Sequence, residues 1–379
     1  MDLICLSHIR WDFVYQRPQH LLNRFAVNNR VFVIEEPVFE AHSDFYEISK
    51  PNEKANLWLV VLHVSKNNSA EKRNHILKAL IDSLMFSNKI EKYLLWYYSP
   101  MALEYTDHLF PALTVYDCMD ELSAFKSPPE GIKEMEACLL SRADIVFTGG
   151  HSLYKAKKHL HHNIHSFPSS IDKSHFGVAK VFKEDPEDQS DIQHPRFGFY
   201  GVIDERFNIS LVDKLATLRP DWHFVFIGPV TKIDRNSLPK KDNIHYLGSK
   251  NYKELPFYLA GWDVAILPFA LNESTKFISP TKTPEYLAGG KPVISTSITD
   301  VVTPYGNQGL VHIADTAEEF IEEAEKIFQS KNNEEWSRKV DDFLSNTSWN
   351  KTWHKMSSLI DTALEKKAII NNNKRKVYV

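Results

Sequence analysis

The length, composition and charge of the chain exclude several classes of protein. With 379 residues, 43% hydrophobic and 12% aromatic, the chain is expected to form two domains with separate cores. Its 45 Lys and Arg residues against 49 Asp and Glu give a formal net charge of -4, which argues against sequence-independent nucleic-acid binding. No apolar run approaches the ~20 residues of a membrane span, and charges interrupt the N-terminal MDLICLSHIRWDF, so we expect neither a transmembrane helix nor a signal peptide. The cysteines Cys5, Cys118 and Cys138 form no CxxC pair, which favours a reducing, cytoplasmic compartment.

The first half of the chain alternates short apolar runs with longer segments of helical period. Strands are predicted at Leu3–Ser7, Arg30–Glu35, Leu57–Val64, Tyr93–Tyr98, Leu113–Asp117 and Asp144–Thr148. Helical patterns occupy Pro18–Val27 and Glu71–Phe86. This alternation predicts a parallel sheet covered by helices.

A polar stretch separates this unit from a second one with the same rhythm. The segment KVFKEDPEDQSDIQHP, residues 180–195, is predicted to be a surface linker. Further strands are predicted at Arg196–Tyr200, Trp222–Ile227, Asn243–Leu247, Asp263–Leu267, Pro292–Ser295 and Leu310–Ile313. Helices are predicted at Glu318–Ser330, Glu334–Leu344 and Trp349–Glu365, before a frayed polar tail. We therefore expect an α/β protein with domains at 1–170 and 196–348, a linker at 171–195, and a C-terminal helix, 349–367, packed back on the first domain.

The distribution of the thirteen glycines indicates where a nucleotide binds. None precedes Gly131, and nine lie between Gly198 and Gly309. Close approach of a phosphate to backbone N–H groups generally requires glycine, so a nucleotide is expected in the second unit. Neither GxGxxG nor the P-loop occurs. Gly201, Gly228 and Gly248 follow predicted strands, where open α/β sheets bind ligands, although each could also serve an ordinary turn.

The stretch SPTKTPEYLAGGKPVIST, residues 279–296, predicts a short helix between a loop and a buried strand. Thr283 reads as an N-cap with proline after it, and the paired glycines supply a C-terminal stop. Lys282 and the helix N-terminus are expected to bind a diphosphate, and Glu285 to accept hydrogen bonds from ribose hydroxyls. The alternative is that Lys282 is solvated and Glu285 only complements the helix dipole.

The same stretch resembles the sugar-nucleotide-binding segment of GT-B glycosyltransferases, in the form S-P-x-K-x-x-E-Y-L-A-x-G-K-P-V. Other segments resemble the family in the right order: WDFVYQRPQHLLNRF, VYDCMDELSAF, FPSSIDKSHF, FGFYGVIDERFNISLVDKL and HYLGSKNYKELPFYLAGWDVAILPF. The most similar members are bacterial enzymes of cell-surface or exopolysaccharide assembly, including teichuronic-acid-type transferases. The resemblance implies two Rossmann-like parallel-sheet domains facing an interdomain cleft.

One position departs from the family pattern. Many retaining GT-B enzymes carry E-x7-E, whose second Glu matches Glu285, but the first position is Phe277 here. The contact usually assigned to the first Glu is therefore not provided. Retention or inversion of the anomeric centre stays open.

The remaining donor-side and catalytic candidates follow from the transfer that the resemblance implies. Negative charge develops on the departing diphosphate, so cations are needed there; Lys282 and Arg206 are the candidates, although Arg206 could be a surface residue paired with Asp204 or Glu205. No DxD-type metal motif is evident, so no metal and no tightly bound cofactor are expected. Further nucleotide contacts are predicted at Ser279, Thr283, Gly201, Gly228, Tyr246 and Leu247.

The acceptor side is expected in the first unit. Asp120, at the carboxyl end of a strand, is the candidate general base; Asp117 and Glu121 are near enough to be confused with it, and Asp120 could instead cap the following helix. Arg17 and His20 are expected to line the acceptor side, where Arg suits an anionic or lipid-phosphate group. The alternative for both is packing at a helix N-terminus.

The segment SLYKAKKHLHHNIH, residues 152–165, clusters basic side chains. Its members are Lys155, Lys157, Lys158, His159, His161 and His162. No Cys or carboxylate completes a zinc site. The segment is expected either to rest on anionic lipid, making the protein peripheral on the inner face of the membrane, or to be a plain solvated face.

These observations predict a glycosyltransferase that moves a sugar from a UDP- or GDP-sugar donor to a saccharide or lipid-linked acceptor. Two alternatives share the architecture. One is a sugar-nucleotide epimerase, which acts without an acceptor, and the other is a two-lobed binding protein that performs no chemistry. Fold alone does not transmit the identity of the base, the sugar or the acceptor.

Overall fold

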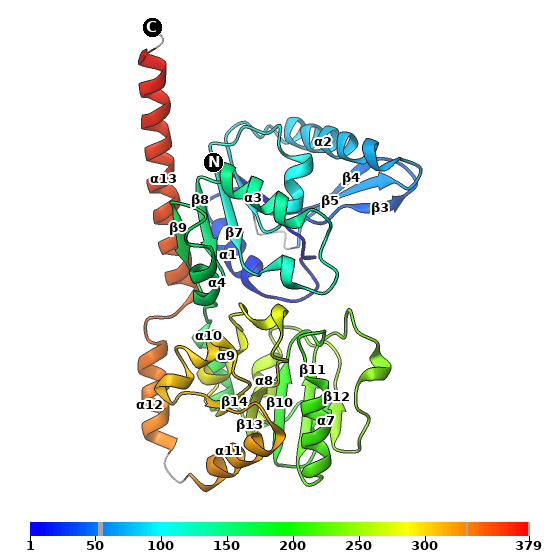
Figure 1. Cartoon of the computed structure of the whole chain (residues 1–379), viewed down its shortest axis with the longest axis vertical. Helices are drawn as coiled ribbons and strands as arrows, with labels where there is room; N and C mark the ends of the chain where they lie inside the picture. The colour runs from blue at the N-terminus through cyan, green and yellow to red at the C-terminus, as the bar shows by residue number, and fades with distance from the viewer. Residues whose placement is uncertain (52–55, 331–332, 378–379) are drawn as a thin grey trace.

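The computed structural model describes residues 1–51, 56–330 and 333–377. Two α/β domains lie one above the other, and the long C-terminal helix α13 (Trp349–Val377) runs along the first domain and projects beyond it (Figure 1). The chain passes between the domains twice, near residues 167–172 and 344–349.

The N-terminal sheet has nine strands, in the order β3-β5-β2-β1-β6-β7-β8-β9, with β4 paired to β5. Its strands are β1 (Asp2–Leu6), β2 (Val31–Ile34), β3 (Val38–Ala41), β4 (Phe45–Ser49), β5 (Leu57–Ser65), β6 (Tyr93–Tyr97), β7 (Leu113–Cys118), β8 (Ile145–Thr148) and β9 (Ile164–Ser166). All pairs are parallel except β4 with β5. The central strands are mostly apolar and buried because helices cover both faces.

Helices pack on the two faces of this sheet. They are α1 (Arg17–Phe25), α2 (Ala70–Ser87), α3 (Ile132–Arg142) and α4 (His151–Lys157). One face buries apolar side chains of α2, α3 and α4. The other buries those of α1 together with Trp349, Met356 and Ile360 of α13, so the last helix completes the first domain.

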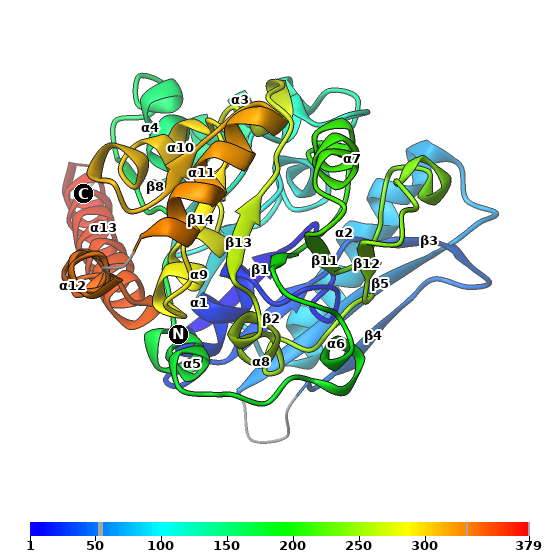
Figure 2. The same ribbon diagram turned by 90° about the horizontal axis from the view of Figure 1, so that it is seen from below.

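The C-terminal sheet has six parallel strands in the order β12-β11-β10-β13-β14-β15. They are β10 (Arg196–Tyr200), β11 (His223–Ile227), β12 (Ile244–Tyr246), β13 (Val264–Leu267), β14 (Val293–Ser295) and β15 (His312–Ile313). The accompanying helices are α5 (Lys173–Gly177), α6 (Glu187–Ser190), α7 (Ile209–Leu218), α8 (Leu255–Ala260), α9 (Lys282–Ala288), α10 (Thr299–Val302), α11 (Ala317–Gln329) and α12 (Asn333–Leu344). One continuous apolar cluster forms the core, and α12 lies on the same side of the molecule as α13 (Figure 2).

Three features differ from the sequence-based expectation. The strands β3, β4 and β9 were not predicted; β3 and β4 extend the sheet edge beside β5. The predicted surface linker is mostly exposed, but it contains the short helix α6, whose Gln189 is fully buried and accepts a hydrogen bond from Trp262 Nε1 at 3.0 Å. The tail expected to fray is helical through Val377, and residues 378–379 lie outside the described residues.

Within the described residues, no helix has both the length and the apolar character that crossing a membrane requires.

Candidate active site

A cavity of about 370 Å³ lies between the two domains. The carboxyl ends of β1, β7 and β8 reach it from the N-terminal sheet, and those of β10 and β11 from the C-terminal sheet. Its walls include Asp120 from the first domain and Gly201, Arg206, Lys282 and Glu285 from the second. Five predicted residues from three separate segments of the sequence therefore meet at one place, at the sheet edges where α/β proteins bind ligands.

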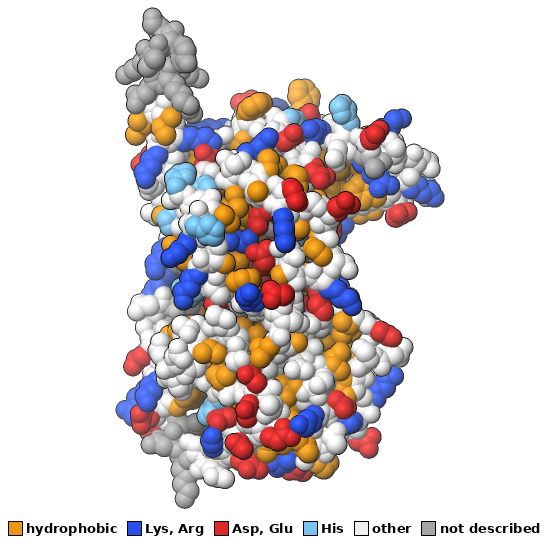
Figure 3. All heavy atoms as spheres, viewed as in Figure 1, with side chains coloured by type: hydrophobic (Ala, Val, Ile, Leu, Met, Phe, Trp, Pro, Cys, Tyr) orange, Lys and Arg blue, Asp and Glu red, His pale blue; other side chains and the backbone are white. Residues whose placement is uncertain are grey.

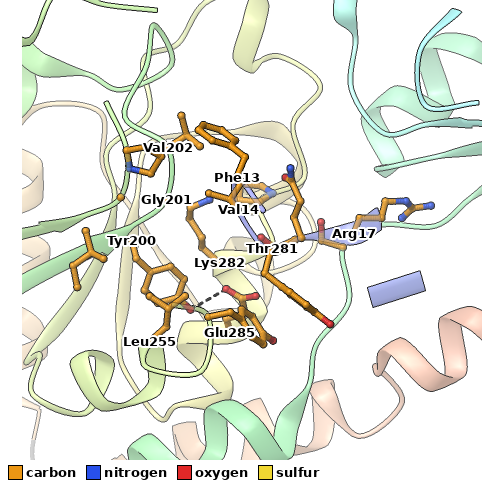
Figure 4. A pocket seen from close by; sticks show the side chains of 18 of the residues that line it. Phe13, Val14, Arg17, Tyr200, Gly201, Val202, Leu255, Thr281, Lys282 and Glu285 are labelled. Carbon is orange, nitrogen blue, oxygen red and sulfur yellow. Dashed lines mark hydrogen bonds between the residues drawn. The ribbon is translucent and has the colours of Figure 1, made fainter. Parts of the chain in front are cut away.

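Lys282 projects into this cavity from the first position of α9 (Figure 4). Within the part of the chain that the structure describes, its Nζ forms no ion pair or hydrogen bond with another side chain. Burial lowers the pKa of Lys282 below its usual value, and the neighbouring Glu285 carboxylate opposes this effect. An ammonium held in a partly dry cavity without a partner gains most from an incoming anion.

One glycine makes room for Lys282, and a second packs against the backbone of the first. Gly201 has φ +144°, and a Cβ there would lie 2.1 Å from Lys282 Cε; Gly228 has φ +138°, and a Cβ there would lie 1.9 Å from Gly201 O. Both backbone conformations strongly favour glycine. These positions are therefore required by close packing as well as by turn geometry.

Glu285 lies one turn along the same helix. Tyr200 Oη donates a hydrogen bond of 2.8 Å to Glu285 Oε2, as the dashed line in Figure 4 shows. Burial raises the pKa of Glu285 to about 7, although the Tyr200 hydrogen bond and the Lys282 charge both act to lower it. Glu285 therefore changes its protonation near neutral pH.

The helix begins two residues earlier than the sequence predicted. Thr281 is the N-cap and Lys282 the first helical residue, because the turn already forms at Pro280, whose carbonyl accepts from Thr283 N at 3.2 Å. Thr283 is fully buried and is not among the residues that line the cavity. The prediction that Thr283 caps the helix and contacts the ligand is wrong.

Three neighbouring acids on the first domain have separate environments. Asp117 is fully buried and accepts from Arg17 Nε at 3.0 Å and Nη2 at 2.8 Å. Glu121 pairs with Lys157 Nζ at 2.7 Å. Only Asp120 lines the cavity, and it does not cap the following 3-10 turn η2 (Leu122–Ala124), whose N-cap is Glu121.

Charged groups of both domains affect the pKa of Asp120. Burial raises its pKa above the usual range, and Asp204 acts in the same direction. The charges of Arg206, Arg17 and Lys282 lower it. A carboxylate whose pKa is raised toward the working pH is better suited to accept a proton than an exposed one.

The sequence left two roles open for Arg206: a cation in the ligand site, or a residue paired with Asp204 or Glu205. Its guanidinium donates to the Asp204 carboxylate, with Nη2 to Oδ2 at 2.6 Å, and the residue also lines the cavity. It lies over the Phe125 ring, with Cζ 5.3 Å from the centroid. Arg206 is therefore a cation held in a direct ion pair, whereas Lys282 forms no such pair among the described residues.

Of the two acceptor-side residues, Arg17 lines the cavity, whereas His20 does not. The Arg17 guanidinium pairs with the Asp117 carboxylate and donates a hydrogen bond from Nη1 to Phe167 O at 2.7 Å. It points away from Lys282 and Glu285 (Figure 4). His20 is buried and stacks on Trp349 with ring centroids 4.5 Å apart. Burial lowers the pKa of His20 to about 3. His20 does not line the cavity. The alternative prediction, packing at the start of the helix, therefore applies to this residue.

Two donor-side predictions are also wrong. Tyr246 Oη donates to Pro239 O at 3.3 Å, and Leu247 packs against the C-terminal core; neither lines the cavity. Tyr246 ends β12, the edge strand of the sheet, and Leu247 follows it. Ser279 does line the cavity, and its carbonyl accepts from Ser169 Oγ at 2.6 Å, which links the two domains.

Sequence reasoning missed two segments of the cavity wall. Residues 11–16 follow β1, and residues 249–252 follow β12; Tyr15 and Tyr252 stack across the domains with centroids 4.5 Å apart. The aromatic run WDFVY was part of the resemblance, and its place directly after a predicted strand was a usable signal.

The basic segment 152–165 does not form one charged face. Lys157 is buried and paired with Glu121 and Glu136, and His161 Nε2 lies 3.0 Å from Ala143 O. The members that remain exposed are Lys155, Lys158, His159 and His162. Figure 3 shows histidine and cationic side chains gathered on the face of the first domain beside α13.

Phe277, at the position of the missing acid, does not line the cavity. It packs against the apolar cluster of the first domain, and Lys276 Nζ lies 5.5 Å from its ring centroid. The residue therefore contributes to the contact between the domains.

Comparison with known proteins finds similar sequences and similar folds. Residues 194–330 match the family model of glycosyl transferases group 1. Over 309 residues, 73% of this chain and 74% of the relative, the sequence is 25% identical to TuaH of Bacillus subtilis (strain 168), which is named as a teichuronic acid biosynthesis glycosyltransferase.

Solved structures share the whole architecture. Sucrose-phosphate synthase from Thermosynechococcus elongatus has a TM-score of 0.71 at 12% identity, with 97% of this chain and 100% of that chain covered. Anabaena HepE in complex with UDP has a TM-score of 0.67 at 11% identity, with 96% and 100% covered. An E. coli trehalose-6-phosphate structure bound with UDP-2-fluoro glucose has a TM-score of 0.66 at 10% identity, with 96% and 99% covered.

Proposed function

We propose that this glycosyltransferase of the GT-B fold moves a sugar from a UDP- or GDP-sugar to a saccharide or lipid-linked acceptor in cell-surface polysaccharide synthesis. The observation that carries the proposal is the Lys282 ammonium, which lines the interdomain cavity without a charged partner among the described side chains. The named role of TuaH in teichuronic acid biosynthesis supports the cell-surface context.

On the donor side, Lys282 and Arg206 stabilise the charge that develops on the departing diphosphate. Protein cations that are already in place act on the transition state without reorganisation, and removal of one such donor typically costs ~10²–10³-fold in rate. The open backbone at Gly201 lets the diphosphate approach closely. We propose that these groups, rather than a metal ion or another cofactor, provide the stabilisation.

Glu285 orients the nucleoside. Its Oε2 already accepts from Tyr200, and the remaining lone pairs can accept from the two ribose hydroxyls. The ionised form accepts such bonds best, and because the pKa of Glu285 is about 7, we expect nucleotide binding to favour the deprotonated carboxylate.

On the acceptor side, Asp120 takes the proton of the attacking hydroxyl if the reaction inverts the anomeric centre. A positioned base of this kind contributes ~10²–10⁴-fold. If the reaction retains configuration, Asp120 instead orients the acceptor. We further propose that the enzyme works in the cytoplasm at the inner face of the membrane, with exposed Lys155, Lys158, His159 and His162 facing anionic lipid.

The test is a thermal-shift panel of UDP, GDP, TDP and their sugars, followed by donor turnover with and without added saccharide acceptors. Because a ligand that binds only the folded state raises its apparent stability, UDP or GDP should raise the melting temperature, and one sugar nucleotide should be consumed faster with an acceptor. Absence of any nucleotide shift would refute the donor site.

A further inference from the structure

A buried ammonium lies behind the loop that carries Asp120. Lys157 ends α4 and is 5% exposed; its Nζ lies 2.7 Å from Glu121 Oε2 and 2.7 Å from Glu136 Oε2. None of these three residues lines the cavity. A buried ion pair is weak evidence of a contribution to stability, because desolvation offsets much of the attraction, so this arrangement calls for another explanation.

On one side, the cluster holds the end of strand β7. Glu136, on α3, accepts from Tyr116 Oη at 2.7 Å, and Cys118 Sγ lies 3.7 Å from the same Oε1 atom. Tyr116 and Cys118 are two of the last three residues of β7. Lys157 therefore fixes, through Glu136, the point at which the chain leaves the sheet toward Asp120.

On the other side, the cluster holds the loop itself. Glu121 directly follows Asp120, and it also accepts from Ser123 Oγ at 2.7 Å, while its carbonyl accepts from Ala124 N at 2.9 Å. The Lys157 contact thus holds the side chain of the residue next to the cavity carboxylate, and the Ala124 contact holds its backbone.

The far end of the same loop contacts the other domain. Phe125 lies between two cations of the second domain, with Arg206 Cζ at 5.3 Å and Lys232 Nζ at 5.2 Å from its ring centroid. Asp120 therefore lies on a segment anchored at one end to the first domain's core and at the other to a cation of the cavity.

We propose that Lys157 is a positioning residue that sets the Asp120 carboxylate for reaction by gripping Glu121 from behind the loop. This inference rests on the proposed glycosyl transfer. Burial opposes the charge on Lys157, but the neighbouring Cys118, Glu136 and Glu121 raise its pKa above the usual value. The Lys157 ammonium therefore stays charged at neutral pH.

The variant Glu121→Gln carries the test. Lys157→Met would leave two carboxylates facing each other in a buried site and is expected to unfold the domain. Glu121→Gln keeps the shape and weakens only the contact to the loop. Lys157→Arg keeps a cation at the site. The matched control is Asp185→Asn, which neutralises the partner of buried Arg196, paired at 2.7 Å at the end of β10 remote from Gly201.

Two readouts distinguish positioning from a merely structural role. For Glu121→Gln we expect faster hydrogen exchange in residues 119–125 and a kcat about 10–100-fold lower, with KM for the donor within about 2-fold because the donor site is on the other domain. Lys157→Arg should retain most of the wild-type kcat. Asp185→Asn should change neither the hydrogen exchange of residues 119–125 nor kcat.

The outcomes separate this inference from the proposed function. Unchanged kcat and exchange in Glu121→Gln, in an enzyme whose wild type transfers sugar, would overturn the positioning role and leave the function standing. An equal loss in Asp185→Asn would also overturn it, because any weakened buried pair would then suffice. If the wild type binds nucleotide but transfers no sugar, the proposed function fails, and the exchange rates of the loop alone decide whether Lys157 holds it.

Discussion

Replacing Lys282 with Met tests the donor site most directly, because the change removes one charge and keeps an unbranched side chain that is only one atom shorter. A hydrogen bond to a charged group contributes about 1.5–3 kcal/mol, and every 1.4 kcal/mol is about tenfold in affinity. UDP or GDP should therefore bind about 10–100-fold more weakly. In the absence of nucleotide the variant should melt at or above the wild-type temperature, since burial lowers the pKa of Lys282 and the folded state disfavours its charge.

The assay is the thermal shift at a fixed nucleotide concentration. At about 100 times Kd, ligand binding adds roughly 2.7 kcal/mol to the stability of the folded state, which corresponds to roughly 5–10 °C for a domain of this size. A ~30-fold weaker Kd at the same concentration leaves roughly 0.9 kcal/mol, or about 2–3 °C.

The matched control is Lys291→Met. Lys291 is in the same domain, burial lowers its pKa too, and its Nζ donates to Ala260 O at 2.7 Å, but it does not line the cavity. This control should keep the full nucleotide shift. A Lys282→Met protein with the wild-type shift, or a control that loses as much, would refute the electrostatic reasoning.

Three further predictions follow from the cavity. Asp120→Asn should lower turnover by ~10²–10⁴-fold if Asp120 is the base and keep the UDP or GDP shift; joint loss of both in steady-state and melting assays would assign Asp120 a binding role instead. Because the pKa of Glu285 is raised from 4.5 to about 7, its ionisation costs folded-state stability as pH rises through that window; Glu285→Gln should gain stability over wild type at pH 8, with the gain vanishing near pH 4.5 in denaturant titrations, and a pH-independent difference would contradict the shift. Gly201→Ala should destabilise by about 1–3 kcal/mol and weaken nucleotide binding, because its Cβ would lie 2.1 Å from Lys282 Cε; full retention of binding by calorimetry would contradict the close packing.

The parts of the molecule that local pattern determines could be predicted from the sequence. Each central strand is a short apolar run, so the two-sheet α/β fold followed from periodicity. Lys282 and Glu285 were predicted beside and within the first turn of one short helix, and the structure brings both to the cavity.

The parts that depend on distant partners could not. Arg17 is an available cation in the sequence, but Asp117, one hundred residues away, binds its guanidinium. In the sequence, His20 is a polar residue near a predicted cleft, but in the structure its ring stacks on Trp349. A polar side chain is buried only where a partner compensates its desolvation, and the sequence around it does not show where that partner comes from.

The return of α13 to the first domain has a consequence for synthesis on the ribosome. Trp349, Met356 and Ile360 pack in one cluster with apolar residues of the N-terminal domain such as Phe25 of α1 and Trp96 of β6. At translation rates of 5–20 residues per second, roughly 10–40 s pass between the last strand of that sheet and this helix. During that interval the nascent domain exposes an apolar surface that α13 later covers. A chaperone that shields this surface should therefore raise the yield of folded enzyme.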